Sequence, residues 1–176
     1  YVAVAWDKRG TNIRKRRELY PEYKAGRKPA PDDFYQQIPI LMELLNAFGW
    51  PLYELDDYEA DDIMGAFARQ AEARGVQTCL LTSDLDALQL VSPLTKVYAM
   101  KNGLRNIEEF TAEYFEQKYG IRTDQFLDLK ALKGDSSDNL PGVPGVGEKT
   151  AVKLLQAYGT LDGVYAHVDE QTGALR

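Results

Sequence analysis

The pattern of apolar positions predicts four short strands in the first hundred residues. Each is a compact apolar run, rich in valine, leucine or tyrosine and bounded by polar residues, glycine or proline. The runs are Val2–Trp6, Leu52–Leu55, Gln77–Thr82 and Lys96–Met100. Runs of this length and composition are typical of strands in the interior of a sheet.

Helix-like segments separate these strands and then continue alone. Pro31, followed by two aspartates, opens a helix that runs to Phe48 and ends at Gly49. Pro39 lies inside it and is expected to kink it or to split it in two. The other predicted helical segments are Ala60–Arg74, the turn Leu85–Leu90, Ala112–Tyr119, Asp124–Leu132, Lys149–Tyr158 and Leu161–Val168.

This order of elements predicts an α/β fold. Strands that alternate with helices favour a mostly parallel central sheet flanked by helices, and the remaining helices form a C-terminal helical part. We therefore expect an α/β core over residues 1–134, with a basic segment at residues 8–28, and a helical part over residues 135–176.

Length and composition are those of one folded domain. The chain has 176 residues, of which 44% are hydrophobic and 27% charged. It contains no apolar run of the ~18 residues that a membrane helix needs and no signal-peptide pattern. Cys79, in an apolar run, is expected to be a buried thiol. A single cysteine forms no internal disulfide, which fits a cytoplasmic protein.

The charge is distributed unevenly. Residues 8–28 hold nine basic residues against Glu18 and Glu22, a net +7, while the rest of the chain carries −13. A basic segment beside an acidic body suits a protein that binds phosphates in one place and metal ions in another. The alternative is a solvated basic loop without a binding role.

Carboxylates recur where predicted strands and helices end, and the carboxyl ends of parallel strands are where functional sites form. Glu59 and Asp62 share one helical face. Taken alone, each acidic residue has an ordinary explanation, such as a helix cap or a turn. Together they form the candidate metal site: Asp7, Glu59, Asp61, Asp62, Asp84, Asp86, Asp135 and Asp138.

So many carboxylates in one place require cations among them. Without these eight residues the formal charge of the chain would be +2, so the candidate site accounts for its acidity. Oxygen ligands suit Mg²⁺, with Mn²⁺ as a substitute, and two such ions can drive phosphodiester hydrolysis. Catalysis by His167 or Cys79 is disfavoured, because neither lies near a suitable partner in the sequence.

A glycine-rich stretch at residues 140–151 is the most distinctive motif. It lacks the lysine of a phosphate-binding P-loop and the third glycine of a dinucleotide-binding loop. It matches a helix–hairpin–helix, in which Gly145 and Gly147 let backbone N–H groups approach a phosphate near Lys149 and Lys153. Such contacts are independent of base sequence. The alternative is a structural turn.

With these motifs the chain resembles the flap endonuclease family, specifically the 5′-nuclease domains of bacterial DNA polymerase I. The resemblance covers nearly the whole chain in the family's order. The matching segments are residues 2–7, 23–27, 58–62, 82–86 and 134–142, the last continuing into the glycine hairpin.

The resemblance implies a two-metal site formed by the eight carboxylates. It also implies that Lys24 and Arg27 contact the scissile phosphate, that Tyr23 stacks on a nucleotide, and that the basic segment contributes to an arch over single-stranded DNA. The hairpin would hold duplex DNA, with K⁺ as a further cation. The residues expected to take part in the chemistry are Asp7, Lys24, Arg27, Asp61 and Asp84. The family's first strand, with another metal-binding aspartate, would precede Tyr1.

The implied function is structure-specific 5′-3′ exonuclease and flap endonuclease activity, serving primer or flap removal in replication and repair. Its partner would be DNA with 5′ flaps or branched ends. One alternative is a module that binds branched DNA without cutting it, because the first strand is absent. A phosphatase that uses Asp84 and Asp86 is a weaker alternative, since it leaves the basic segment and the hairpin without a role.

Overall fold

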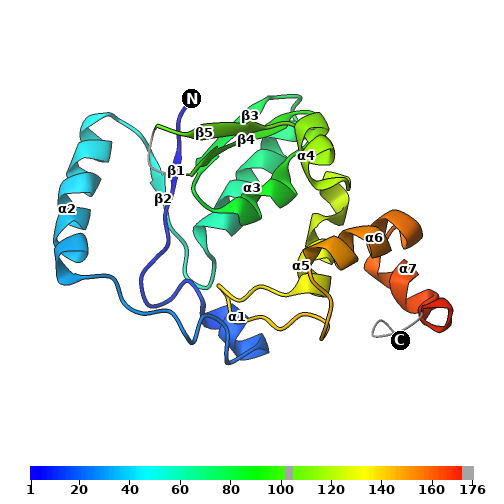
Figure 1. Ribbon diagram of the computed structural model, residues 1–176. Helices are drawn as coiled ribbons and strands as arrows, with labels where there is room; N and C mark the ends of the chain where they lie inside the picture. The colour runs from blue at the N-terminus through cyan, green and yellow to red at the C-terminus, as the bar shows by residue number, and fades with distance from the viewer. Residues whose placement is uncertain (102–104, 172–176) are drawn as a thin grey trace. The chain divides into compact units, whose positions relative to one another are not determined.

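The computed structural model describes residues 1–101 and 105–171 (Figure 1). The chain forms two compact units. The first consists of Tyr1–Ala66 together with the short segment Ser137–Asn139, and the second of Phe67–Ser136 and the chain from Leu140 onward. In the described part of the chain, no helix is long and apolar enough to cross a membrane.

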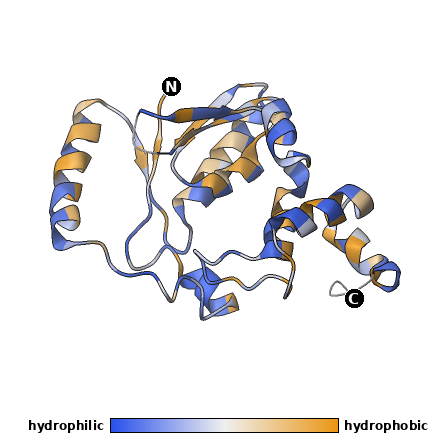
Figure 2. Ribbon diagram, in the orientation of Figure 1, coloured by the Kyte–Doolittle hydropathy of each residue, from blue (hydrophilic) through white to orange (hydrophobic). Residues whose placement is uncertain are grey.

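The first unit pairs two short strands and carries the basic segment. Its elements are β1 (Val4–Ala5), α1 (Arg14–Leu19), α2 (Asp32–Ala47), β2 (Leu52–Tyr53) and the start of α3 (Ala60–Glu72). Strands β1 and β2 are parallel, with Val4 opposite Leu52. Helix α1 is hydrophilic over most of its length, as Figure 2 shows, which follows from its sequence Arg-Lys-Arg-Arg-Glu-Leu.

Helix α2 is one continuous helix, so of the two predicted effects of Pro39 the split does not occur, and a kink stays a prediction. Proline removes one backbone N–H donor and leaves the carbonyl of Tyr35 without its intrahelical partner. None of the residues of α2 is buried. Water can therefore satisfy that carbonyl, and the helix continues through Pro39 to its end at Ala47.

The second unit contains a three-stranded sheet and most of the helices. Strand β4 lies between β3, to which it is parallel, and β5, to which it is antiparallel. The elements are β3 (Thr78–Thr82), η1 (Leu85–Leu90), β4 (Thr95–Met100), β5 (Ile107–Phe110), α4 (Ala112–Tyr119), η2 (Thr123–Gln125), α5 (Phe126–Lys133), α6 (Glu148–Tyr158), α7 (Leu161–Ala166) and η3 (Val168–Glu170).

The predicted α/β class is confirmed, and two of the three strand pairings are parallel. The described strands form two separate sheets, however, rather than the single central sheet that we predicted. Strand β5 was not predicted, because the sequence Ile-Glu-Glu-Phe has two charged residues in its centre. Those glutamates are tolerated because Glu108 and Glu109 form ion pairs with lysines.

The core of the second unit is aromatic and aliphatic. Phe110 and Phe115 are fully buried, and the Phe115 ring packs edge-on against Phe126 with centroids 5.6 Å apart. Leu129 of α5 and Leu155 of α6 are also buried, which joins these two helices through their apolar faces. Because α5 and α6 pack against each other, the two ends of the loop between them are held in place.

The thiol of Cys79 is exposed, so the prediction of a buried cysteine is wrong. Alternate side chains of a strand face opposite sides of the sheet. In β3 the face that carries Leu80 is buried, whereas Cys79 and Leu81 lie on the exposed face. An apolar run was therefore not evidence that both faces of this strand are covered.

Candidate active site

In the first unit, carboxylates and basic side chains from three segments meet around the buried side chain of Glu59. The Lys24 ammonium forms an ion pair with Glu59. Arg27 contacts Asp138 at 2.6 Å, and the Lys24 ammonium lies 3.8 Å from the same carboxylate. Glu59 and Asp138 are 5% and 8% exposed, so these charges depend on their partners rather than on water.

Tyr23 lies between the same two carboxylates. Its phenolic oxygen is 2.7 Å from Glu59 and 2.9 Å from Asp138. Burial and the two neighbouring carboxylates raise the pKa of Tyr23 above its ordinary value, so the phenol keeps its proton and acts as a donor. The ring is only 7% exposed and is therefore not available to stack on a nucleotide in this structure. The stacking role stays a prediction that requires Tyr23 to move.

Arg16 of α1 fixes the start of α3. Its guanidinium binds Asp62 through two hydrogen bonds of 2.7 and 3.0 Å and lies 3.1 Å from Glu59. Partial burial alone would raise the pKa of Asp62, but the hydrogen bonds from Arg16 and from the Glu59 backbone lower it overall. Asp62 also accepts a hydrogen bond of 2.9 Å from the Glu59 N–H at the start of α3.

The backbone around Lys24 is interlocked with the loop that carries Asp138. Lys24 has a left-handed φ of 55°, as does Asn139 with a φ of 60°. The Lys24 N–H donates to the Asp138 carbonyl at 3.0 Å, and the Asn139 amide donates to the Glu22 carbonyl at 2.8 Å. Non-glycine residues adopt this conformation rarely, and such strain is concentrated at functional sites.

The remaining predicted ligands of the first unit lie at the start of α3. Asp7 accepts a hydrogen bond of 2.7 Å from the Ala60 N–H, so it compensates one of the free donors at this helix end. Asp61 is in the first turn of the same helix. The basic segment is held nearby by ion pairs of Lys8 with Asp56 and of Arg14 with Asp57. These contacts argue against a solvated, unstructured basic loop.

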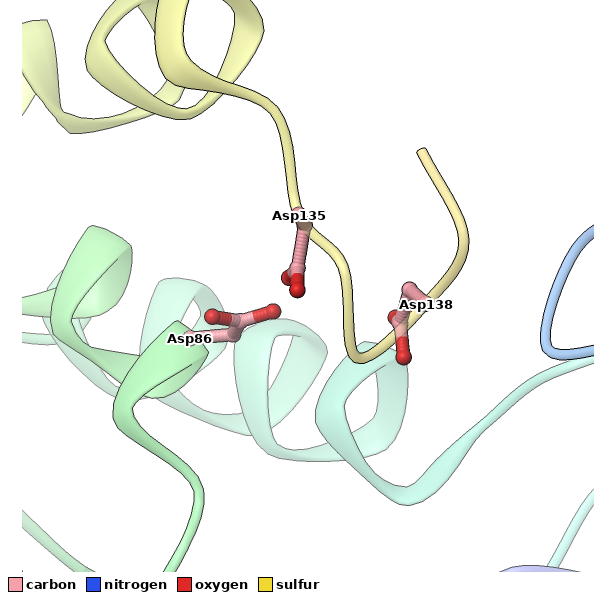
Figure 3. A group of neighbouring side chains, drawn as sticks. All are labelled: Asp86, Asp135 and Asp138. Carbon is pink, nitrogen blue, oxygen red and sulfur yellow. The ribbon is translucent and has the colours of Figure 1, made fainter. Parts of the chain in front are cut away.

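In the second unit, Asp86 and Asp135 form a pair of carboxylates (Figure 3), and their oxygen atoms lie within 4.8 Å of each other. Asp86 belongs to η1 and Asp135 to the loop after α5. The ammonium of Lys130 lies 2.6 Å from each carboxylate. Asp84 caps η1 by accepting from the Asp86 N–H at 2.9 Å.

The Lys130 ammonium is the positive charge that lies between these two carboxylates. Burial, followed by the negative charges of Asp84 and Asp135, raises the pKa of Asp86, and Lys130 only partly offsets this effect. Burial lowers the pKa of Lys130, but its two carboxylate partners raise it overall, so its ammonium stays charged. Closely spaced carboxylates that raise one another's pKa values are stabilised by added positive charge.

The eight predicted ligands are thus divided between the units. Three of them, Asp84, Asp86 and Asp135, are in the second unit, and the other five are in the first. Sequence reasoning counted Arg16 only as one of several basic residues, and it missed Lys130 altogether. The signal for Lys130 was its position in the last turn of a helix, five residues before an aspartate.

The carboxylates of each unit fit a metal ion by their chemistry. They offer oxygen donors alone, which Mg²⁺ and Mn²⁺ prefer. In the second unit two of them approach closely enough to share one cation, the ammonium of Lys130. No histidine takes part in either group, since His167 stacks on Tyr158 and its ring nitrogen contacts the Gly163 carbonyl.

The loop between α5 and α6 depends on two glycines that approach each other closely. A Cβ atom on Gly142 would lie 2.3 Å from the Gly134 nitrogen, and one on Gly134 would lie 2.4 Å from the Gly142 nitrogen. The backbones of Asp135 and Leu140 exchange two hydrogen bonds of 2.8 Å. This close backbone contact fixes the position of the Asp135 backbone, from which the carboxylate side chain extends.

The second half of the loop leads into α6. Gly145 has a φ of 82°, which suits glycine, and Gly147 is the residue before the helix. The apolar residues Ala151, Leu154 and Leu155 of this helix are buried. Lys149 and Lys153 are exposed on α6.

The architecture is similar to that of solved proteins that were determined with DNA. A bacteriophage T5 flap endonuclease, solved with DNA and metal ions, matches with a TM-score of 0.80 and 21% identity over 95% of this chain and 63% of that one. The catalytic core of Rad2 with a DNA substrate matches with a TM-score of 0.59 and 20% identity, over 92% of this chain and 48% of that one. At these identities the comparison establishes the fold.

Sequence comparison establishes the family. Residues 1–120 match the N-terminal resolvase-like domain of 5′-3′ exonucleases, and residues 121–176 match their C-terminal SAM fold. The chain belongs to the 5′-3′ exonuclease family. This confirms the predicted class of enzyme, a nuclease.

The relatives are DNA polymerases I. The enzyme of Bacillus caldotenax is 47% identical over 173 residues, and that of Lactococcus lactis subsp. lactis is 46% identical over 171. These matches cover 98% and 96% of this chain but only 20% and 19% of the relatives. The chain therefore spans about a fifth of the length of the curated relatives, in agreement with the resemblance found in the sequence.

Proposed function

We propose that this chain is the core of a structure-specific 5′-nuclease that hydrolyses phosphodiester bonds in DNA with 5′ flaps or branched ends. In a protein of the DNA polymerase I type, its role would be to remove primers and flaps during replication and repair. The observation that carries the proposal is the grouping of the candidate carboxylates against basic side chains, in a chain that matches the 5′-3′ exonuclease family over its whole length.

The carboxylates would hold two Mg²⁺ ions, with Mn²⁺ as a substitute. Bound ions would supply an activated water and stabilise the leaving oxygen. The proposed ligands are Asp7, Glu59, Asp61, Asp62, Asp84, Asp86, Asp135 and Asp138.

Lys24 and Arg27 would bind the scissile phosphate. Both already face carboxylates of the site, Lys24 facing Glu59 and Arg27 facing Asp138. Their charges are thus held where a phosphate would meet the metal ligands. Fixed positive groups at this place stabilise the negative charge that develops on phosphate in the transition state.

The loop between α5 and α6 would act as a helix–hairpin–helix that binds the DNA backbone. The exposed lysines of α6 and the turn at Gly145 and Gly147 support this assignment. Duplex DNA would bind here without regard to base sequence. Carbonyl groups of the turn would accommodate K⁺.

Cleavage of a 5′-labelled flap duplex in Mg²⁺ tests the proposal directly. In the full-length protein we expect short labelled products released from the 5′ side, and no product after chelation by EDTA. An uncut duplex carrying the same sequence without a flap serves as the control for structure specificity. Tight binding of the flap without any cleavage in Mg²⁺ would favour a module that only recognises branched DNA.

Divalent ions are expected to raise the melting temperature of the protein. An ion that binds only the folded state stabilises it by RT ln(1 + [L]/Kd), which is about 2.7 kcal/mol at a hundred times Kd. The double substitution Asp84→Asn and Asp86→Asn should reduce this increase, while an amide at position 84 can still cap η1. Differential scanning fluorimetry at millimolar Mn²⁺ measures the effect. An unchanged wild-type melting temperature would contradict the metal site.

DNA binding at the hairpin is expected to depend on salt but not on sequence. Each phosphate contact contributes about 0.9 to the slope of log K against log salt concentration on duplex DNA. Lys149→Ala and Lys153→Ala should each lower that slope by a similar amount on unrelated duplexes, as measured by fluorescence anisotropy. If the two substitutions weakened binding to only one base sequence, this would contradict the proposal that the hairpin binds the DNA backbone.

A further inference from the structure

Lys130 occupies the position between two of the proposed metal ligands. Its ammonium nitrogen lies 2.6 Å from an oxygen of Asp86 and 2.6 Å from an oxygen of Asp135. The three side chains are 22%, 28% and 10% exposed, so water contributes little to holding the two carboxylates near each other. All three residues belong to the second unit, on η1, on α5 and in the loop that follows α5.

The same place cannot hold the ammonium and a divalent ion together. Mg²⁺ binds carboxylate oxygens at about 2.0–2.1 Å, so an ion bridging Asp86 and Asp135 would lie where the Lys130 nitrogen now lies. The two oxygens, within 4.8 Å of each other, would need to approach by less than about 1 Å to share such an ion. A positive charge directly beside the ion would also oppose its binding.

We propose that Lys130 is an exchangeable counter-ion of the metal site. In the metal-free protein its ammonium neutralises Asp86 and Asp135 and keeps them close together. When a divalent ion binds, the ammonium leaves and the ion takes its place. This inference rests on the proposed function, because it assumes that Asp86 and Asp135 are metal ligands.

The surroundings of Lys130 permit this exchange. Its backbone is fixed, since its carbonyl accepts from the Gly134 N–H at 2.8 Å at the end of α5. Its ammonium is carried by a flexible four-carbon side chain, which can rotate toward solvent without moving the helix. The nearby Lys133 forms its own ion pair with Glu148 at 2.8 Å and so does not replace Lys130 at the two aspartates.

A purely structural ion pair makes the opposite prediction for metal binding. If Lys130 served only to position the carboxylates, its removal would let Asp86 and Asp135 separate and would weaken metal affinity. If the ammonium competes with the ion, its removal strengthens affinity, although the metal-free protein becomes less stable. The direction of the change in affinity therefore separates the two roles.

The test is calorimetric titration of Mn²⁺ into the full-length protein, wild type and Lys130→Met, at constant pH and without DNA. We expect Lys130→Met to bind Mn²⁺ about tenfold more tightly, the change that follows from releasing ion pairs of this partly buried kind. Adding Asp86→Asn to this variant should abolish the gain. Lys118→Met is the matched control, because Lys118 pairs with Glu108 away from the aspartates, and it should leave affinity unchanged.

The outcomes distinguish the exchange from the metal site on which it rests. Binding by the wild type with equal or weaker binding by Lys130→Met overturns the exchange and leaves the metal site intact. An absence of binding by both proteins overturns the metal site and the exchange together. Circular dichroism confirms folding of each variant. Lys130→Gln, which keeps a polar side chain of similar length, gives the same test should Lys130→Met not fold.

Discussion

Lys24→Ala is expected to slow single-turnover cleavage of 5′-flap DNA by roughly 10²-fold or more, the value of one preorganised donor at a developing negative charge. Lys24 is set apart from the other basic residues by its surroundings. Its side chain is 12% exposed, it pairs with Glu59, and its backbone is held in a left-handed conformation by the loop of Asp138. Its charge is therefore held in place before substrate binds. Because we expect this charge to act mainly on the chemical step, the affinity of the Lys24→Ala variant for flap DNA should fall only slightly.

Lys15→Ala provides the control within the same basic segment. Lys15 donates a hydrogen bond of 3.0 Å to the hydroxyl of Tyr58 and contacts no carboxylate of the candidate site among the described residues. Its loss should weaken binding a little and leave the rate at saturating enzyme nearly unchanged. Rapid-quench measurements on the full-length protein give both rates. Equal losses for the two variants would mean that Lys24 is merely one of several interchangeable surface cations.

Gly142→Ala is expected to destabilise the protein by about 3 kcal/mol or more and to abolish cleavage. A Cβ atom there would lie 2.3 Å from the Gly134 nitrogen and 2.6 Å from the Lys133 carbonyl oxygen. These are backbone atoms at the end of α5, so no side-chain rotation relieves the clash. The loop must open, and Asp135 would lose the backbone contact with Leu140 that fixes its position.

Gly147→Ala is the matched control in the same loop. Gly147 has a negative φ of −91°, and no heavy atom lies within 4 Å of the position of a Cβ atom. The change should cost less than about 1 kcal/mol, mainly through the poorer helix N-cap. Urea denaturation of both variants measures the difference. Comparable stability of the two would show that the contact between Gly134 and Gly142 is not needed.

Much of the local structure could be predicted from the sequence, because it depends on neighbouring residues. Helix α4 has the bounds that its period predicts, and α6 differs from its prediction by one residue. The predictions that were wrong concern features that depend on tertiary packing. Cys79 looked buried because the sequence does not reveal which face of β3 is covered, and Pro39 did not split α2 because that exposed helix leaves its freed carbonyl to water.

The candidate site, too, could be predicted from the sequence only in part. The acidic residues could be named from the sequence, since carboxylates at the ends of strands and helices stand out by position alone. Their partners could not, because ion pairing depends on distances in space. Arg16 reaches Asp62 from 46 residues away, and Arg27 reaches Asp138 from 111 residues away.

The sequence by itself thus determined the family, the class of chemistry and the set of candidate ligands, because these depend on residue types in a fixed order. Only the tertiary structure decided how the charges are balanced. It buried Tyr23 between two carboxylates, and it brought Lys130 between Asp86 and Asp135. The physical reason is that burying a charge is costly unless an opposite charge lies beside it. The packing of the helices that carry the charged residues decides which pairs form.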